Sequence, residues 1–128
     1  MEYYGLGQGP IPIRGVTPDT KSCKFILANN VVFCSRSEIK NGVFYSVLQY
    51  IGPAENAAKH RYRVEIFNKE RTEILAVTRV ARSLGEDLSE IHNSGNCVKL
   101  YPDQYNRFSN EGSELAFSME ILTVGKRC

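Results

Sequence analysis

Residues 60–67 alternate apolar and polar side chains one by one, and residues 115–121 repeat this pattern near the other end of the chain. Successive side chains of a β-strand point to opposite faces of a sheet, so each stretch predicts a strand with one buried and one solvated face. A half-buried sheet needs a second apolar layer, and another sheet supplies it in a sandwich. The predicted inward side chains are Tyr62, Val64, Ile66, Leu115, Phe117, Met119 and Ile121.

Two further strands are predicted in residues 31–34 and 43–51, where apolar residues again recur with a period of two. The Lys-Asn-Gly of residues 40–42 lies between them and predicts a hairpin turn, because Asn and Gly tolerate positive φ. The Asn-Lys-Glu of residues 68–70 predicts another turn, which leads into a partner strand over residues 71–78.

The hydrophobic period changes to a helical one after residue 82. Ser83 and Glu86 have the spacing of a capping box, and Leu84, Leu88 and Ile91 follow at helical spacing, so the pattern predicts a short helix that starts at Ser83. Later features are a helix end at residues 93–96, a strand at 97–101, a second short helix from Pro102 through Phe108, and a turn at Asn110-Glu111-Gly112.

The chain has 128 residues, of which 42% are hydrophobic, and this is enough for one compact core. We expect an extended arm at residues 1–21, because its many Gly and Pro residues oppose a long helix. We expect the sandwich domain to occupy residues 22–128. The arm can add an edge strand to it.

Within the arm, Ile11 and Ile13 alternate with Pro12 and Arg14, which favours an extended segment along a sheet edge. A partner peptide can pair with the backbone of such an edge. We therefore predict that pockets around Ile11, Ile13 and Val16 bind a peptide. A terminus rich in Gly and Pro can equally be mobile, and both interpretations stay open.

Charge and hydropathy exclude several partner classes. Lys and Arg number 16 against 14 Asp and Glu, a balance that disfavours nucleic-acid binding through phosphate neutralisation. The sequence has neither an apolar run of about 18 residues nor a signal-peptide pattern, so no membrane partner is expected. We expect a cytoplasmic protein, with the nucleus as a further location. In a reducing cytosol the four cysteines, Cys23, Cys34, Cys97 and Cys128, are expected to be free thiols, although their even number leaves disulfides open.

No catalytic site, metal site or cofactor is predicted. The two histidines, His60 and His92, lack an evident nucleophile or base in the sequence, and no two cysteines have Cys-x-x-Cys spacing. We interpret His92 as a cation or donor near a helix C-terminus. Cys97 begins an apolar strand and is interpreted as a small core residue.

Residues 43–52, 62–66, 82–84, 93–98 and 110–115 resemble successive segments of the C-terminal domain of the seven-in-absentia ubiquitin ligases. The resemblance extends over approximately residues 22–122, and the order and spacing of the segments make it more specific than any single motif. It implies an all-β fold, an eight-stranded antiparallel TRAF-like β-sandwich with one or two short helices.

The resemblance also implies function. Family domains form homodimers and bind degron-containing proteins or adaptors for ubiquitin-dependent degradation, while catalytic transfer depends on a RING domain that these residues do not contain. Family members bind degron peptides, often with Val-x-Pro, through acidic, tryptophan and methionine side chains that precede the Ser-Cys matching Ser22-Cys23. This chain has no tryptophan, so none of those groove residues is carried over.

Three functional interpretations follow. The chain is a substrate-recognition domain, a RING-less regulatory decoy that forms mixed dimers with related ligases, or a fragment of a complete RING ligase. If these residues are the whole natural product, the chain alone is not a complete ligase.

Overall fold

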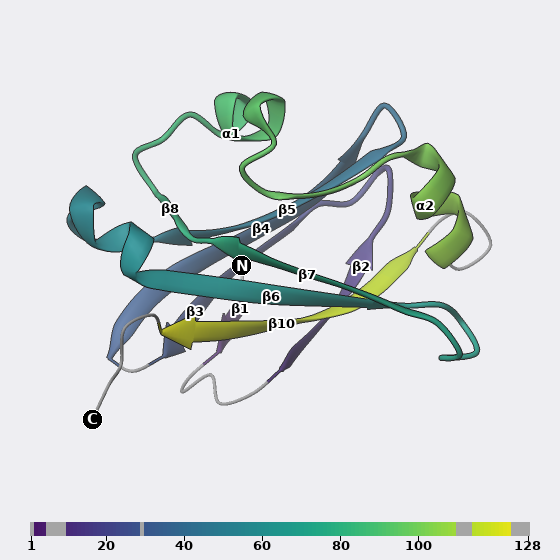
Figure 1. Ribbon diagram of the computed structural model, residues 1–128, viewed down its shortest axis with the longest axis horizontal. Helices are drawn as coiled ribbons and strands as arrows, with labels where there is room; N and C mark the ends of the chain where they lie inside the picture. The colour runs from purple at the N-terminus through teal and green to yellow at the C-terminus, as the bar shows by residue number, and fades with distance from the viewer. Residues whose placement is uncertain (1, 5–9, 29, 110–113, 124–128) are drawn as a thin grey trace.

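The computed structural model describes residues 2–4, 10–28, 30–109 and 114–123. These residues form ten strands in two sheets, two short α-helices and one 3-10 helix (Figure 1). The strands are β1 (Glu2–Tyr4), β2 (Ile11–Val16), β3 (Ser22–Ala28), β4 (Val31–Lys40), β5 (Val43–Tyr50), β6 (His60–Phe67), β7 (Ile74–Val80), β8 (Arg82–Ser83), β9 (Val98–Leu100) and β10 (Leu115–Thr123), and the helices are η1 (Ala54–Lys59), α1 (Leu88–Ser94) and α2 (Pro102–Phe108).

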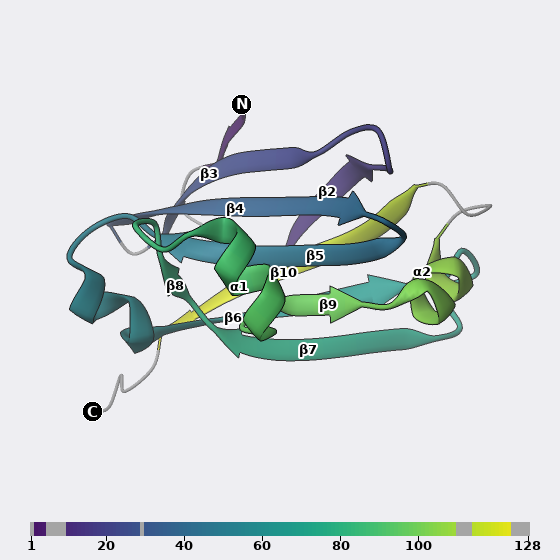
Figure 2. The ribbon, with the colours of Figure 1, turned by 90° about the horizontal axis from the view of Figure 1, so that it is seen from above.

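The two sheets pack face to face and confirm the predicted all-β sandwich. The six-stranded sheet has the order β1-β3-β4-β5-β8, with β9 also paired to β5, and the four-stranded sheet has the order β2-β10-β6-β7. Figure 2 looks onto the outer face of the six-stranded sheet, where α1 lies in front of β5 and β9 lies between β5 and β7.

The strand count and the strand directions differ from the expectation of eight antiparallel strands. Three of the ten strands, β1, β8 and β9, have three residues or fewer, too few to show an alternating pattern in the sequence. Two of these short strands also run parallel to their neighbours, β1 beside β3 and β8 beside β5.

The two strands that the alternation predicts most clearly, β6 and β10, are antiparallel neighbours. Phe117 is opposite Ile66, and Met119 is opposite Val64. All four side chains are buried in one core cluster. The predicted inward face is therefore confirmed.

An aromatic contact joins the two sheets through this core. The rings of Phe44, on β5, and Phe117, on β10, have centroids 5.2 Å apart and planes at 71°. This edge-to-face geometry is one that aromatic pairs prefer, because the positive edge of one ring meets the negative face of the other.

Local sequence signals fixed several boundaries correctly. Asn41 and Gly42 have φ angles of 54° and 80° and link β4 to β5, as the hairpin prediction required. Helix α2 begins at Pro102 and ends at Phe108, as predicted. The turn predicted at residues 110–112 lies outside the described residues.

The predicted helix start at Ser83 is wrong. Helix α1 begins at Leu88, and its N-cap is Asp87, whose carboxylate accepts a hydrogen bond from the Ser89 backbone N–H at 2.9 Å. Ser83 instead ends β8, and its backbone N–H donates to the Glu86 carboxylate at 3.0 Å. The capping-box residues thus close a turn between β8 and α1.

The strand predicted for residues 71–78 begins later, at Ile74. The Asn68 side chain explains the difference, because it holds a longer loop closed. Its amide oxygen accepts from the Glu73 backbone N–H at 2.9 Å, and its amide nitrogen donates to Thr72 at 2.8 Å. Arg71 has a φ of 60°, which turns the chain within this loop.

Replacing Phe117 with Ala should lower the free energy of unfolding by about 3 to 5 kcal/mol, because the substitution leaves a cavity opposite Phe44. Urea denaturation followed by circular dichroism measures the change. Ser118 is the next residue on β10 and faces outward, so Ser118→Ala should change the free energy by less than about 0.5 kcal/mol. A similar loss in the two variants would contradict the assigned faces of β10.

Candidate functional site

The predicted peptide-binding residues lie on β2, an edge strand of the four-stranded sheet. Among the described residues β2 pairs only with β10, so its other edge is open. The side chains of Ile11, Ile13 and Val16 are 8%, 0% and 0% exposed and belong to the core cluster. Their burial makes them supports of the edge, and a direct contact with a peptide remains a prediction for these three residues.

The outer face of the same sheet has a groove beside β2. It has a volume of about 280 Å³, and of the three predicted residues Ile13 is in its lining. The other lining residues are Pro10, Pro12, Glu65, Phe67, Arg71, Ala116, Phe117 and Ser118. A neighbouring hollow of about 230 Å³ shares Phe67, Arg71 and Ala116. The two hollows together define what we call the β2 groove.

Strand pairing explains how remote residues meet in the β2 groove. Pro12 is opposite Ser118 on β10, and Ser118 is opposite Glu65 on β6. These three residues occupy outward positions between the inward residues of their strands. Sequence alone did not identify the groove, because its residues come from three separate segments.

The β2 groove combines apolar surface with fixed charges. The Arg71 guanidinium carbon lies 4.5 Å from the Phe67 ring centroid, a cation–π arrangement between two residues that line both hollows of the groove. The Glu65 carboxylate accepts a hydrogen bond from Arg63 Nε at 3.1 Å. The groove therefore offers an apolar floor next to two basic side chains, Lys69 and Arg71, and two acidic ones, Glu65 and Glu114.

A different surface lies on the six-stranded sheet, where α1 packs on β5. The rings of His92 and Tyr45 are stacked with centroids 4.1 Å apart. Glu38 Oε2 lies 3.7 Å from His92 Nδ1, and Glu38 Oε1 lies 3.4 Å from Lys21 Nζ. Val47, Ile91 and Cys97 form a small apolar cluster beside this stack, which confirms Cys97 as a core residue.

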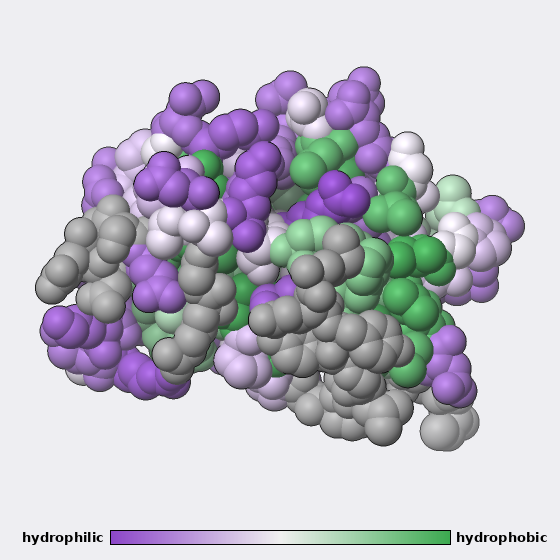
Figure 3. Space-filling model, turned by 180° about the vertical axis from the view of Figure 1, so that it is seen from behind, coloured by the Kyte–Doolittle hydropathy of each residue, from purple (hydrophilic) through white to green (hydrophobic). Residues whose placement is uncertain are grey.

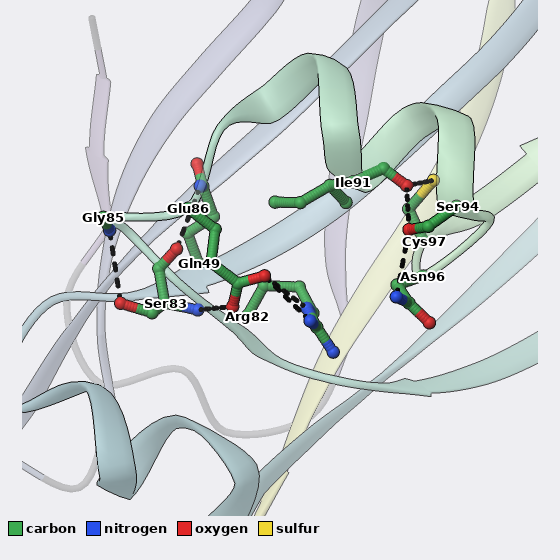
Figure 4. Close-up of polar contacts among 9 residues, drawn as sticks. All are labelled: Gln49, Arg82, Ser83, Gly85, Glu86, Ile91, Ser94, Asn96 and Cys97. Atoms are coloured by element: carbon green, nitrogen blue, oxygen red, sulfur yellow. Dashed lines mark hydrogen bonds and ion pairs between the residues drawn. The ribbon is translucent and has the colours of Figure 1, made fainter.

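The connection from β8 to α1 is held by polar contacts (Figure 4). Arg82 Nη2 lies 2.8 Å from Glu86 Oε1, and the Gln49 side chain donates to the Ser83 carbonyl at 3.3 Å. Partial burial raises the pKa of Glu86, but the hydrogen bonds from Arg82 and from the Ser83 backbone outweigh it, so the pKa is lowered overall. The connection therefore keeps a charged carboxylate at neutral pH.

Both histidines are packed as neutral rings. Burial lowers the pKa of His92, and the neighbouring Lys40 adds to this effect. Burial also lowers the pKa of His60, whose ring stacks on Tyr50 with centroids 5.3 Å apart. His92 lies in the last turn of α1, as predicted, and its lowered pKa disfavours the cation half of the interpretation, while the donor half stays a prediction.

The described residues contain no group of three or more His, Cys, Asp or Glu side chains that could hold a metal ion. In the same part of the chain, Cys23, Cys34 and Cys97 are free thiols. No described helix is long and apolar enough to span a membrane.

Acidification should destabilise the fold, starting near the ordinary histidine pKa of 6.5. The unfolded chain takes up protons on His60 and His92 there, whereas both buried rings resist protonation, so the stability present above that pH is lost as the pH falls. Urea denaturation at steps between about pH 7.5 and pH 5 measures the slope, and a His60→Gln, His92→Gln variant should flatten it. An equal slope in the variant would assign the loss to other groups.

The comparison with known protein families matches residues 24–120 to the model described as Sina, TRAF-like domain. No curated protein matches the chain. The matched segment includes most of both sheets, from β3 to β10. The chain therefore belongs to the Sina TRAF-like domain family, a family of protein-interaction domains.

Proposed function

We propose that the chain recognises degron-containing proteins or adaptors for ubiquitin-dependent degradation, and that the β2 groove is the recognition site. The family match carries the protein-interaction role. The choice of site rests on the open edge of β2 next to an apolar groove. Fold alone does not determine function, so the chemistry of this groove sets the details.

An extended segment of a partner fits this site in two ways. Its backbone can pair with the open edge of β2, which supplies main-chain hydrogen bonds without regard to sequence. Pro12 has no N–H, so the edge lacks a donor at that position and pairing there is incomplete. Side-chain contacts in the groove must then supply the remaining affinity.

The groove favours a partner with an apolar residue next to an acidic one. Phe67 and Pro12 give apolar contact, and aromatic side chains are frequent energetic anchors of interfaces. Arg71 offers a guanidinium that pairs well with a carboxylate. A basic partner segment would meet this positive charge unfavourably.

The proposed assembly is a homodimer, or a mixed dimer with related ligases. Sedimentation of the purified chain at several concentrations distinguishes a monomer from a dimer. Mixing it with a full-length relative carrying a RING domain then tests for mixed dimers. Mixed dimers support the decoy role, and their absence supports a role as an independent recognition domain. A chain that stays monomeric and forms no mixed dimer contradicts the dimeric part of the proposal.

Binding should depend on the surface of the groove. We expect Phe67→Asp to weaken the binding of labelled peptides with an apolar residue next to an acidic one at least tenfold, about 1.4 kcal/mol, because it removes the aromatic contact and places a competing carboxylate beside Arg71. Fluorescence anisotropy measures the affinity. Deleting β2 is a poorer test, because it removes Ile13 and Val16 from the core.

Thr78→Asp is the matched control. Thr78 is exposed on β7, the other edge strand of the same sheet, outside the β2 groove. It should leave the affinity unchanged. A loss in Thr78→Asp with none in Phe67→Asp would move the site to β7, and no binding of any such peptide by the unmodified chain would reject the degron role.

The surface on the far side of the molecule in Figure 1 is not uniformly polar. Figure 3 shows apolar surface among polar surface on the side opposite the viewer of Figure 1. Apolar surface of this kind is common on soluble proteins and does not mark a site by itself. The pairing of an open edge with a charged, apolar groove is what distinguishes the site on β2.

A further inference from the structure

Two cysteines from neighbouring strands are in contact on the outer face of the six-stranded sheet. Cys23 Sγ and Cys34 Sγ are 3.7 Å apart. Cys34 is opposite Phe25, two residues along β3 from Cys23, so the two thiols are diagonal neighbours on one face. A disulfide needs its sulfurs about 2.05 Å apart, and rotation of the side chains must supply most of the closure.

The two thiols differ in their access to solvent. Cys23 is partly exposed and lines a pocket of about 140 Å³ together with Lys21, Leu88 and His92. Cys34 is 1% exposed. A small oxidant in the pocket therefore reaches the Cys23 sulfur first, while Cys34 lies behind it.

Arg36 brings positive charge to both thiols. It is directly opposite Cys23 in the strand register and lines the same pocket. Its Nε is buried and has no hydrogen-bond partner among the described residues, so an N–H donor remains available at this place. Burial raises the pKa of the Cys34 thiol, and the Arg36 side chain opposes that rise. Positive neighbours and available donors are features of oxidisable cysteines.

We propose that Cys23 and Cys34 form a redox-sensitive modification site that hydroperoxides oxidise to a disulfide. The Cys23 thiolate attacks a peroxide oxygen, the O–O bond breaks, and the leaving hydroxide takes up the proton that the Cys23 thiol lost. Cys34 then attacks the resulting sulfenic sulfur, the S–O bond breaks, and the hydroxyl leaves with the Cys34 proton as a second water. Two thiols lose two electrons, and one hydrogen peroxide becomes two waters.

The placement of Cys34 makes the oxidation of Cys23 reversible. A sulfenic acid that finds no second thiol is oxidised further to a sulfinic acid, which simple thiols do not reduce. Cys34, already in contact with the Cys23 sulfur, captures the sulfenic acid before this step. Cys97 lies apart in the small core cluster, where its thiol contacts the Ile91 carbonyl oxygen at 3.8 Å.

Mass spectrometry of the hydrogen-peroxide-treated chain tests the proposal. After oxidation and alkylation of the remaining thiols, trypsin cuts after Lys21, Lys24 and Arg36 and places the two cysteines on separate peptides, residues 22–24 and 25–36. We expect these peptides to be joined with the loss of two hydrogens and to separate on reduction. Oxidation at Cys23 should be at least about tenfold faster than at Cys97.

Four variants sharpen the result. Cys34→Ser should lose the cross-link and accumulate sulfinic acid at Cys23, Cys97→Ser should keep the cross-link, and Arg36→Met should slow its formation while Arg36→Lys retains more of the rate. Circular dichroism checks that each variant is folded, and Cys34→Val replaces Cys34→Ser if the hydroxyl unfolds the chain. Cross-linking of Cys23 to Cys128, equal oxidation of Cys97, or sulfinic acid at Cys23 in the unmodified chain would overturn the proposal.

Discussion

The edge-to-face contact between Phe44 and Phe117 is the interaction on which the arrangement of the two sheets depends. It forms only if β5 and β10 both point these side chains into the space between the two sheets, at positions that face each other. A slip of β10 by one residue against β6 would replace Phe117 with Ala116 or Ser118 and expose the buried side chains of the strand. The same register determines which side chains of β2, β10 and β6 point outward, because side chains alternate between the two faces of a strand. The β2 groove is therefore a consequence of how the core is packed.

Polar groups within the sandwich restrict the register further. The hydroxyls of Ser37 and Ser46 face each other across β4 and β5 at 2.9 Å, and Tyr62 from the opposite sheet donates to the Ser46 carbonyl at 3.4 Å. Burial raises the pKa of Tyr62, so its hydroxyl stays a donor. The folded state loses stability when a buried polar group has no hydrogen-bond partner. These contacts therefore disfavour alternative alignments of the two sheets.

Residue patterns predicted the parts of the fold that local physics determines. The backbone preferences of Asn41-Gly42 and of Pro102 are intrinsic to these residues and do not depend on tertiary contacts. The hairpin and the start of α2 could therefore be predicted from the sequence. Ser83 and Glu86 could not, because their capping pattern also closes a turn, and Asp87 nearby is the better N-cap. Strand β3 did not stand out either, since its inward face includes Lys24 among apolar residues.

The two proposed sites were less accessible to sequence analysis, because each depends on strand pairing. Ile11, Ile13 and Val16 pointed to β2, and Ile13 lines the groove, but the rest of the lining comes from neighbours of these residues and from residues more than fifty positions away. Cys23 and Cys34 looked like two unrelated thiols until the pairing of β3 with β4 placed them in contact.

The two surfaces lie on the outer faces of different sheets, with the aromatic core between them. A cross-link between β3 and β4 joins neighbours that are already paired, so it need not change the order of either sheet. The β2 groove is built from β2, β10 and β6 and shares no strand with the cysteine pair. An effect of oxidation on binding has two routes, the close-packed core contacts between the sheets and the short turn from β2 to β3, which paired backbone hydrogen bonds between Thr17 and Thr20 close.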